Sequence, residues 1–179
     1  MPEPFPIGRS APPATFAMAD PLRALLAPRA GERVLEIGAG NGSYTLEIAA
    51  AVLPDGTVDI LDAHPDQLAE AMHAAGRRGL RNVAPTLGDP RYLPFEDAAF
   101  DAAYLVAALG DQLDCAATLA EVRRVMRAGG RLVVGELNGD PHRVAPAQLG
   151  ACAESAGLRV ARRVDGLLGY VARLEPTSG

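Results

Sequence analysis

The residues of this chain whose types and spacing suit binding chemistry begin with a glycine turn. Gly38, Gly40 and Gly42 alternate directly behind an apolar run, in the stretch VLEIGAGNG. Glycine tolerates positive φ and leaves backbone N–H groups bare, so such a turn at a helix start lets a ligand approach the main chain. Glu36 precedes the turn inside the apolar run, where an unpartnered carboxylate is costly to bury. The acid therefore predicts a cationic or hydrogen-bonding group beside it.

Two further carboxylates stand where predicted strands end. Asp62 closes the stretch TVDILD, twenty residues after Gly42, and a carboxylate there can accept both hydroxyls of a ribose. Asp89 closes the stretch LGD and is placed to accept from an exocyclic amine such as that of adenine. Asp62 alone fits NAD and S-adenosylmethionine equally. The glycines, Glu36 and both aspartates together discriminate better than any one of them.

The glycine register disfavours a dinucleotide. The fingerprint G-x-G-x-x-G needs glycine at position 43, where this chain has Ser43, a residue able to cap the following helix. All 17 basic residues are arginine, and the absence of lysine excludes both a Schiff base and a phosphate-loop lysine. An NAD(P)-dependent oxidoreductase of Rossmann type stays open as an alternative, because the turn and Asp62 both suit it.

Strands that alternate with helices must position these residues. Short apolar runs predict the strands, and apolar residues at helical spacing predict the helices between them. The strands are expected at 33–37, 57–62, 82–89, 99–109 and 131–137, and the helices at 43–53, at 65–77, from 114 to the stretch RAGG, and at 146–157. The tail predicts two strands joined at Asp165 and Gly166, a hairpin signal. The alternation indicates a doubly wound, mostly parallel sheet, which binds ligands beyond the carboxyl ends of its strands.

Composition fits a single globular domain over residues 1–179. Hydrophobic residues make up 49% of the chain and charged residues 22%, and no apolar run is long enough for a membrane span. The net charge of −5, with the arginines scattered along the chain, disfavours nucleic acid as a partner. The N-terminus lacks a signal-peptide pattern, so we expect a cytoplasmic protein.

Cysteine and histidine spacing predicts no metal site. Cys115 and Cys152 lie far apart, each at an apolar position of a predicted helix. They are expected to be small core residues in a reducing compartment, and neither a disulfide nor a metal pair. His64, His73 and His142 lack ligand spacing. His142 follows the last parallel strand and is the one candidate for a catalytic general base, since an unperturbed pKa of about 6.5 suits that role.

Four ordered stretches carry a family resemblance. They are VLEIGAGNGSYTLEIA, VDILDAHPDQLAEA, LGDPRYLPFEDAAFDAAYLV and EVRRVMRAGGRLVVGE. Together they resemble the motifs of class I S-adenosylmethionine-dependent methyltransferases, and within them the branch of the ubiquinone and menaquinone C-methyltransferases. The likeness implies a Rossmann-like, seven-stranded, mostly parallel sheet with a C-terminal antiparallel hairpin strand and helices on both faces. It implies a short N-terminal lid or helix (1–30), a cofactor-binding core (31–137) and a substrate-side helix and hairpin (138–179).

The resemblance also implies which residues hold S-adenosylmethionine and its product S-adenosylhomocysteine. The glycine turn would pass under the methionine part, with Glu36 supporting its amino group, and Asp62 would hold the ribose. Ala63 would pack against the adenine, and a turn at 88–90 would border the adenine edge. Two residues of the fourth strand would close the pocket from that side. The implied cofactor-binding residues are Glu36, Gly38, Ala39, Gly40, Gly42, Asp62, Ala63, Gly88, Asp89, Pro90, Val106 and Ala107.

The methyl acceptor stays undefined. Relatives often carry a polar pair such as His or Glu where this chain has AALGD (107–111), so no acceptor chemistry is carried over. Asp111, Gln112 and Arg143 are loop candidates for substrate contact. The lid is short, which leaves a pocket that is either open or completed by another subunit, as in a homodimer. We therefore predict methyl transfer to a small molecule, with a non-catalytic methyltransferase-like binding subunit as a further alternative.

Overall fold

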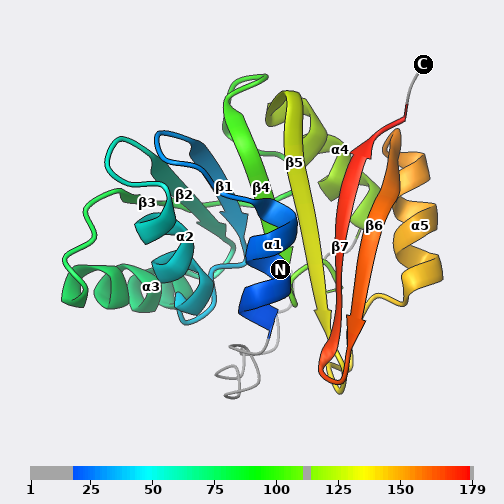
Figure 1. The fold of residues 1–179 in the computed structure, drawn as a ribbon, viewed down its shortest axis with the longest axis horizontal. Coiled ribbons are helices and arrows are strands. Elements are labelled where there is room, and N and C mark those ends of the chain that lie inside the picture. The colour runs from blue at the N-terminus through cyan, green and yellow to red at the C-terminus, as the bar shows by residue number, and fades with distance from the viewer. Residues whose placement is uncertain (1–17, 111–113, 178–179) are drawn as a thin grey trace, which may run out of the picture.

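One sheet with helices on both faces forms the body of the molecule (Figure 1). The structure is a computed structural model, and it describes residues 18–110 and 114–177. The helices are α1 (Ala19–Leu26), α2 (Ser43–Ala51), α3 (Pro65–Arg77), α4 (Cys115–Val125) and α5 (Pro146–Ser155). The strands are β1 (Arg33–Ile37), β2 (Thr57–Asp62), β3 (Val83–Leu87), β4 (Phe100–Val106), β5 (Met126–Leu137), β6 (Leu158–Gly166) and β7 (Gly169–Pro176).

The seven strands lie in the order β3-β2-β1-β4-β5-β7-β6. Neighbours from β3 to β5 pair in parallel, whereas β7 is antiparallel to both β5 and β6. This arrangement confirms the predicted fold class. The chain winds outward from β1 in one direction and from β4 in the other, so the topological switch point lies between these two central strands.

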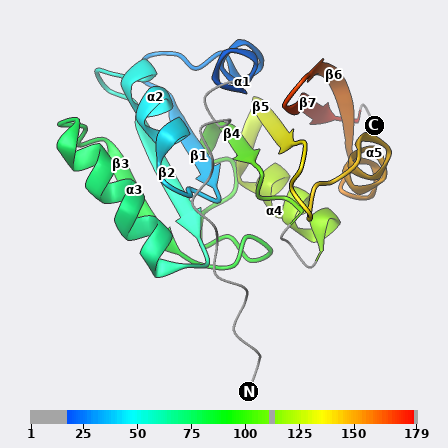
Figure 2. The same cartoon turned by 90° about the horizontal axis from the view of Figure 1, so that it is seen from below.

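Two apolar cores cover the two faces of the sheet. Helices α1, α2 and α3 lie on one face, and α4 and α5 lie on the other (Figure 2). The central strands are buried on both sides, with four of the five residues of β1 buried. Such strands carry short, continuous apolar runs, as parallel strands covered by helices do. Buried Arg131 fixes the end of α1, because its Nε donates to the Leu26 carbonyl at 2.6 Å.

The hairpin turn differs from the predicted one. Gly166 pairs with Gly169, so the two-residue loop is Leu167 and Leu168, and Asp165 still belongs to β6. Asn138, which follows β5, donates from its backbone N–H to the Leu168 carbonyl and from Nδ2 to the Leu167 carbonyl, at 2.7 and 2.9 Å. Pairing with β5 and these two bonds set the register, which overrides the local preference of the Asp-Gly pair.

Two other strand ends also differ. β5 begins at Met126, directly after α4, where the sequence predicts a start at 131. β4 ends at Val106 instead of continuing to 109, because Ala107 has a φ of 50° and leaves the extended conformation. Both changes follow from tertiary pairing and backbone geometry that apolar patterning does not encode.

The prediction that the two cysteines are unpaired is wrong. Cys115 at the start of α4 and Cys152 in α5 form a disulfide, with their Cα atoms 5.9 Å apart. The two helices pack side by side on one face of the sheet, and this packing brings together residues 37 positions apart in the chain. Sequence spacing alone did not reveal the pair, because nothing local to either helix reports on the other.

Opening this disulfide should destabilise the protein. A bond that closes a loop of this length contributes roughly 2–4 kcal/mol, largely by restricting the unfolded chain. We expect the urea midpoint of the oxidised protein to fall on addition of a phosphine reductant. A Cys115→Ser, Cys152→Ser double variant should show the lower midpoint with or without reductant. Two titratable thiols in the unreduced, denatured wild-type protein would contradict the bond.

Candidate cofactor and acceptor site

The glycine turn connects β1 to α2 at the carboxyl edge of the sheet. Gly38, Gly40 and Gly42 have φ values of 79°, 52° and 78°, a region that residues with a Cβ rarely adopt. The Gly38 N–H donates to the Leu61 carbonyl of β2 at 2.8 Å, which holds the turn against the neighbouring strand. The predicted cap from Ser43 does not form. Instead, the Asn41 side chain accepts from both the N–H and the hydroxyl of that serine.

The space next to each of the three glycines is used differently. A Cβ on Gly38 would lie 2.5 Å from the Ala108 Cβ, and a Cβ on Gly42 would lie 2.9 Å from the Ala71 Cα. These two glycines therefore make room for the protein itself. A Cβ on Gly40 would meet nothing within 4 Å. Gly40 thus forms an open cradle in which a ligand can approach the backbone.

Glu36 lies buried beneath this turn, with 3% of its surface exposed. It accepts a hydrogen bond of 2.5 Å from the Thr45 hydroxyl of α2. Burial raises the pKa of Glu36 from 4.5 to about 8, against the opposing effect of the Thr45 and Tyr104 hydroxyls, and the charge of Asp62 adds to the rise. The Tyr104 hydroxyl is close but is not aligned for a hydrogen bond. The site therefore contains an acid that stays largely protonated until a cation approaches.

Asp62 ends β2 on the same edge. The residue is 8% exposed, and Oδ1 accepts from the His64 backbone N–H at 2.9 Å and lies 3.1 Å from His64 Nδ1. Among the described residues, the hydrogen bonds of this carboxylate all involve Oδ1, so Oδ2 can accept from a ligand. Ala63, directly after it, is exposed and presents a small apolar surface.

Asp89 follows β3, and its turn is linked to that of Asp62. The Gly88 N–H donates to the Asp62 carbonyl at 3.1 Å, and Pro90 is buried. Both Asp89 oxygens contact the Arg91 guanidinium, whose hydrogen bonds hold the pKa of Asp89 below its usual value. The carboxylate expected at the adenine edge is therefore already occupied by a neighbouring side chain.

The residues after β4 complete this edge. Val106 and Ala107 are half-buried, and the Ala107 N–H donates to the Gly135 carbonyl at 2.8 Å. Ala107 has a positive φ of 50°. Such a conformation costs a non-glycine residue of order 1–3 kcal/mol, and residues that adopt it are frequent at functional sites. Ala39, the remaining residue of the predicted cofactor-binding set, is buried in the core on the face of the sheet that α2 and α3 cover. The cofactor residues proposed from sequence therefore gather at the ends of β1, β2, β3 and β4.

The predicted acceptor residues are less closely placed. His142 is exposed, and its backbone carbonyl lies where a Cβ on Gly110 would stand, so the loops after β4 and β5 touch. The described contacts of His142 do not reach the glycine turn. The Arg143 guanidinium lies over the Tyr170 ring, 5.3 Å from its centroid, on the opposite face of the sheet from Glu36. Asp111 and Gln112 lie outside the described residues.

Sequence reasoning missed an apolar hollow beside α1. Its volume is about 450 Å³, and its lining is mostly apolar. Met18 and the hairpin tip at 166–169 form much of its wall. A Cβ on Gly135 would lie 3.3 Å from Val106 and 3.8 Å from the Met18 methyl. The hollow therefore adjoins the end of β4. In the sequence, the adjacent leucines Leu167 and Leu168 directly after the predicted hairpin signal could have indicated it.

The fold and the gathered residues define a Rossmann-like methyltransferase architecture, and comparison with known proteins gives the family. The model for the methyltransferase domain matches residues 34–130, more than half of the chain. The chain belongs to this methyltransferase domain family.

Curated relatives share this part of the chain. The demethylmenaquinone methyltransferase of Beutenbergia cavernae is 37% identical over 116 residues, which cover 65% of this chain and 45% of that protein. O-methyltransferase cnsE of Penicillium expansum is 34% identical over 116 residues, covering 64% and 41%. The chain spans less than half the length of these relatives.

Solved structures confirm the fold. A SAM-dependent methyltransferase from Aquifex aeolicus superposes with a TM-score of 0.83 at 20% identity, covering 91% of this chain and 93% of that one. The [4+2]-cyclase SpnF superposes with a TM-score of 0.72 at 25% identity, covering 83% of this chain and 58% of that one.

A pair of alanine substitutions tests the cradle. Gly40→Ala should fold with a modest loss of about 1–2 kcal/mol, because its Cβ meets no protein atom but its φ is strained. The same substitution should weaken S-adenosylhomocysteine binding at least roughly tenfold, a loss of about 1.4 kcal/mol, since it fills the cradle. Gly42→Ala should lose clearly more stability, because its Cβ meets the α3 backbone. Calorimetric titration and urea unfolding measure both effects. Unchanged affinity in Gly40→Ala would contradict the assignment.

Glu36 should make stability fall as pH rises. Its pKa is about 8 in the folded protein, above the ordinary value of 4.5, so the folded state keeps a proton that the unfolded chain releases. The stability that this proton provides is present below pH 4.5 and is lost as pH rises through about 8. Relative to Glu36→Gln, the wild-type protein should lose roughly 1 kcal/mol or more across this range. Glu70→Gln, at an exposed position of α3, is the control and should not show this pH-dependent difference. A pH-independent difference would mean that Glu36 is ionised throughout.

Proposed function

We propose that this chain transfers the methyl group of S-adenosylmethionine to a small-molecule acceptor and releases S-adenosylhomocysteine. The observation that carries the proposal is the convergence of an open glycine cradle with two acids at one edge, in a chain of the methyltransferase domain family. Gly40 leaves room for a ligand, Glu36 is a buried acid suited to an ammonium group, and Asp62 keeps one oxygen for hydroxyl donors. These features fit the cofactor that the family implies.

The chain's own residues have mainly a positioning role in this proposal. When bound, the cofactor supplies a methyl group that is already activated by a sulfonium centre. Glu36 would accept from the amino group at one end and Asp62 from the ribose, which fixes the cofactor at two points. Ala63 and the turn at 88–90 would enclose the base. Val106 and Ala107 would exclude water from the reacting centre, so orientation and desolvation would provide much of the catalysis.

The hollow beside α1 is the place we propose for the acceptor. It adjoins Val106 through Met18 and Gly135, and its volume suits a small organic molecule. His142 is retained as a candidate base. The described part of the chain has no helix long and apolar enough to span a membrane. The same proposal includes a homodimer, in which a second copy of the chain completes the acceptor site.

A cytoplasmic location is also proposed, on the sequence pattern alone. A reducing cytoplasm would favour the open form of the Cys115–Cys152 bond. Alkylation of free thiols at the moment of lysis, followed by mass spectrometry, tests this part of the proposal. We expect a fully alkylated pair in the cell, with the bond present in the purified, oxidised protein. A bonded pair at the moment of lysis would contradict the cytoplasmic location.

The alternatives differ in their support. Membership of the methyltransferase domain family argues against a nicotinamide-dependent oxidoreductase. A protein of similar fold at 25% identity is named as a [4+2]-cyclase, so the fold is not restricted to proteins named for methyl transfer. The non-catalytic binding subunit stays as the second alternative. Product analysis distinguishes both alternatives from methyl transfer, because an oxidoreductase would form an oxidised or reduced product and a binding subunit would form none.

Ligand-induced stabilisation gives the first test. S-adenosylhomocysteine at about 100 times its dissociation constant adds about 2.7 kcal/mol, which raises the melting temperature of a chain of this size by roughly 5–10 °C. Asp62→Ala should remove most of this shift, because it deletes the ribose contact. Asp55→Ala, at an exposed loop before β2, should keep it. No shift at saturating ligand, or a shift with NADPH instead, would overturn the proposal.

A further inference from the structure

We propose that Arg91 is a competitor of the cofactor's adenine for Asp89, so that cofactor affinity and base selectivity are set by how readily this ion pair opens. The inference rests on the proposed function and concerns a residue outside the predicted cofactor set. It would make Arg91 a specificity-determining residue that the ligand must displace.

The first observation is that one residue contacts both carboxylate oxygens of Asp89. Oδ1 accepts from the Arg91 backbone N–H at 2.9 Å and from its Nε at 3.0 Å. Oδ2 accepts from Nε at 3.1 Å and from Nη2 at 2.6 Å. The single Nε hydrogen is shared between the two oxygens, so three N–H groups of Arg91 donate to a carboxylate with about four lone-pair positions. Because the guanidinium lies across both oxygens, an incoming exocyclic amine competes with it for Asp89.

The second observation is that the backbone around Asp89 is held without the guanidinium. The Gly88 N–H donates to the Asp62 carbonyl, and the Tyr92 N–H donates to the Asp89 carbonyl at 3.0 Å. Removal of the Arg91 charge should therefore free the carboxylate without loosening the turn.

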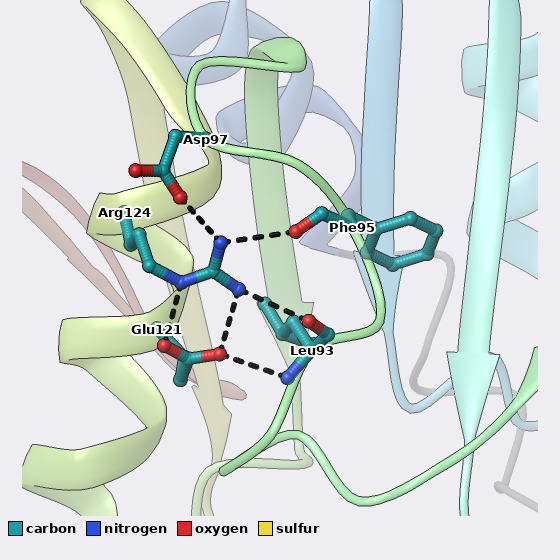
Figure 3. A network of polar contacts seen from close by, with 5 residues as sticks. All are labelled: Leu93, Phe95, Asp97, Glu121 and Arg124. Carbon is teal, nitrogen blue, oxygen red and sulfur yellow. Dashed lines mark hydrogen bonds and ion pairs between the residues drawn. The ribbon is translucent and has the colours of Figure 1, made fainter.

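A larger clamp holds the segment that follows (Figure 3). Arg124 of α4 donates to the carbonyls of Leu93 and Phe95 at 3.0 Å each and pairs with Asp97. Glu121 accepts from the Leu93 N–H at 2.9 Å. The loop is thus fixed to α4 from Leu93 onward. This anchoring does not depend on the ion pair between Asp89 and Arg91.

The third observation is that a displaced guanidinium has somewhere to go. The side chains of Asp89 and Arg91 are 38% and 30% exposed, so the pair opens toward solvent. The Arg91 guanidinium already lies 5.8 Å from the centroid of the Tyr92 ring, where a cation–π contact can retain it. The ion pair is screened by salt and is weak enough for a ligand to open.

The test compares wild-type protein with Arg91→Gln by calorimetric titration of two ligands. S-adenosylhomocysteine carries the adenine amine, and its purine-riboside analogue has a hydrogen atom at that position and no N1–H that could donate to the carboxylate instead. We expect Arg91→Gln to bind the adenine ligand about twofold to fivefold more tightly at low salt, which is the range that opening an exposed pair can cost. The gain should shrink as salt screens the pair in the wild-type protein. The purine-riboside ligand should gain nothing, so selectivity for adenine should rise.

Two controls keep the result specific. Arg81→Gln removes an exposed arginine before β3 with the same change in net charge and should alter neither affinity. Addition of Asp89→Asn should abolish the gain of Arg91→Gln. If the wild-type protein binds but Arg91→Gln binds equally or more weakly, or gains equally for both ligands, the competition is refuted. If the wild-type protein binds neither ligand, the proposed function itself fails.

Discussion

The parallel pairing of β1 with β2 on one side and β4 on the other is the constraint on which the candidate site depends. Glu36 lies opposite Ile60 in one pair and Tyr104 in the other. Because adjacent parallel strands end at the same edge, the turns that follow them meet there. The Gly38 N–H continues this pairing with a bond to the Leu61 carbonyl, so the glycine turn is an extension of the sheet. Its position is set by strand pairing rather than by the loop itself.

The same pairing explains the unusual state of Glu36. A central strand covered by helices gives a side chain no access to water, and the Thr45 hydroxyl is its one hydrogen-bond donor with good geometry among the described residues. A carboxyl group so placed favours its neutral form. In our account, the ammonium of a ligand would restore the charged form. The fold would thereby hold a cation-binding group ready at the cost of some stability in the empty protein.

Much of the architecture could be predicted from sequence, because each buried strand is a short apolar run that ends at a turn residue. The gathering of Asp62 and Asp89 with the glycines follows from the same pattern. The hairpin turn could not be predicted, since Asn138 and β5 fix its register from a distant part of the chain. The disulfide also depends on how α4 packs against α5. Thr45 becomes a partner of Glu36 only when α2 folds back onto the sheet.

Some contacts near the candidate site are local in the sequence and could be predicted from it. Arg91 lies two residues after Asp89, and short-range pairs of this kind need no tertiary information. The exposed leucines at the hairpin tip gave an equally local signal of an apolar surface near the sheet edge. Arg91 directly follows the predicted cofactor-binding residues at 88–90 in the sequence.

The most direct test of the central claim is mass spectrometry of cell extract incubated with the protein and deuteriomethyl-labelled S-adenosylmethionine. Our account predicts at least one small molecule that becomes heavier by one deuteriomethyl group, with S-adenosylhomocysteine formed in equal amount. The Asp62→Ala variant should produce neither. Cofactor that is bound but recovered unchanged, with no labelled product in extracts known to contain the acceptors of related enzymes, would contradict methyl transfer.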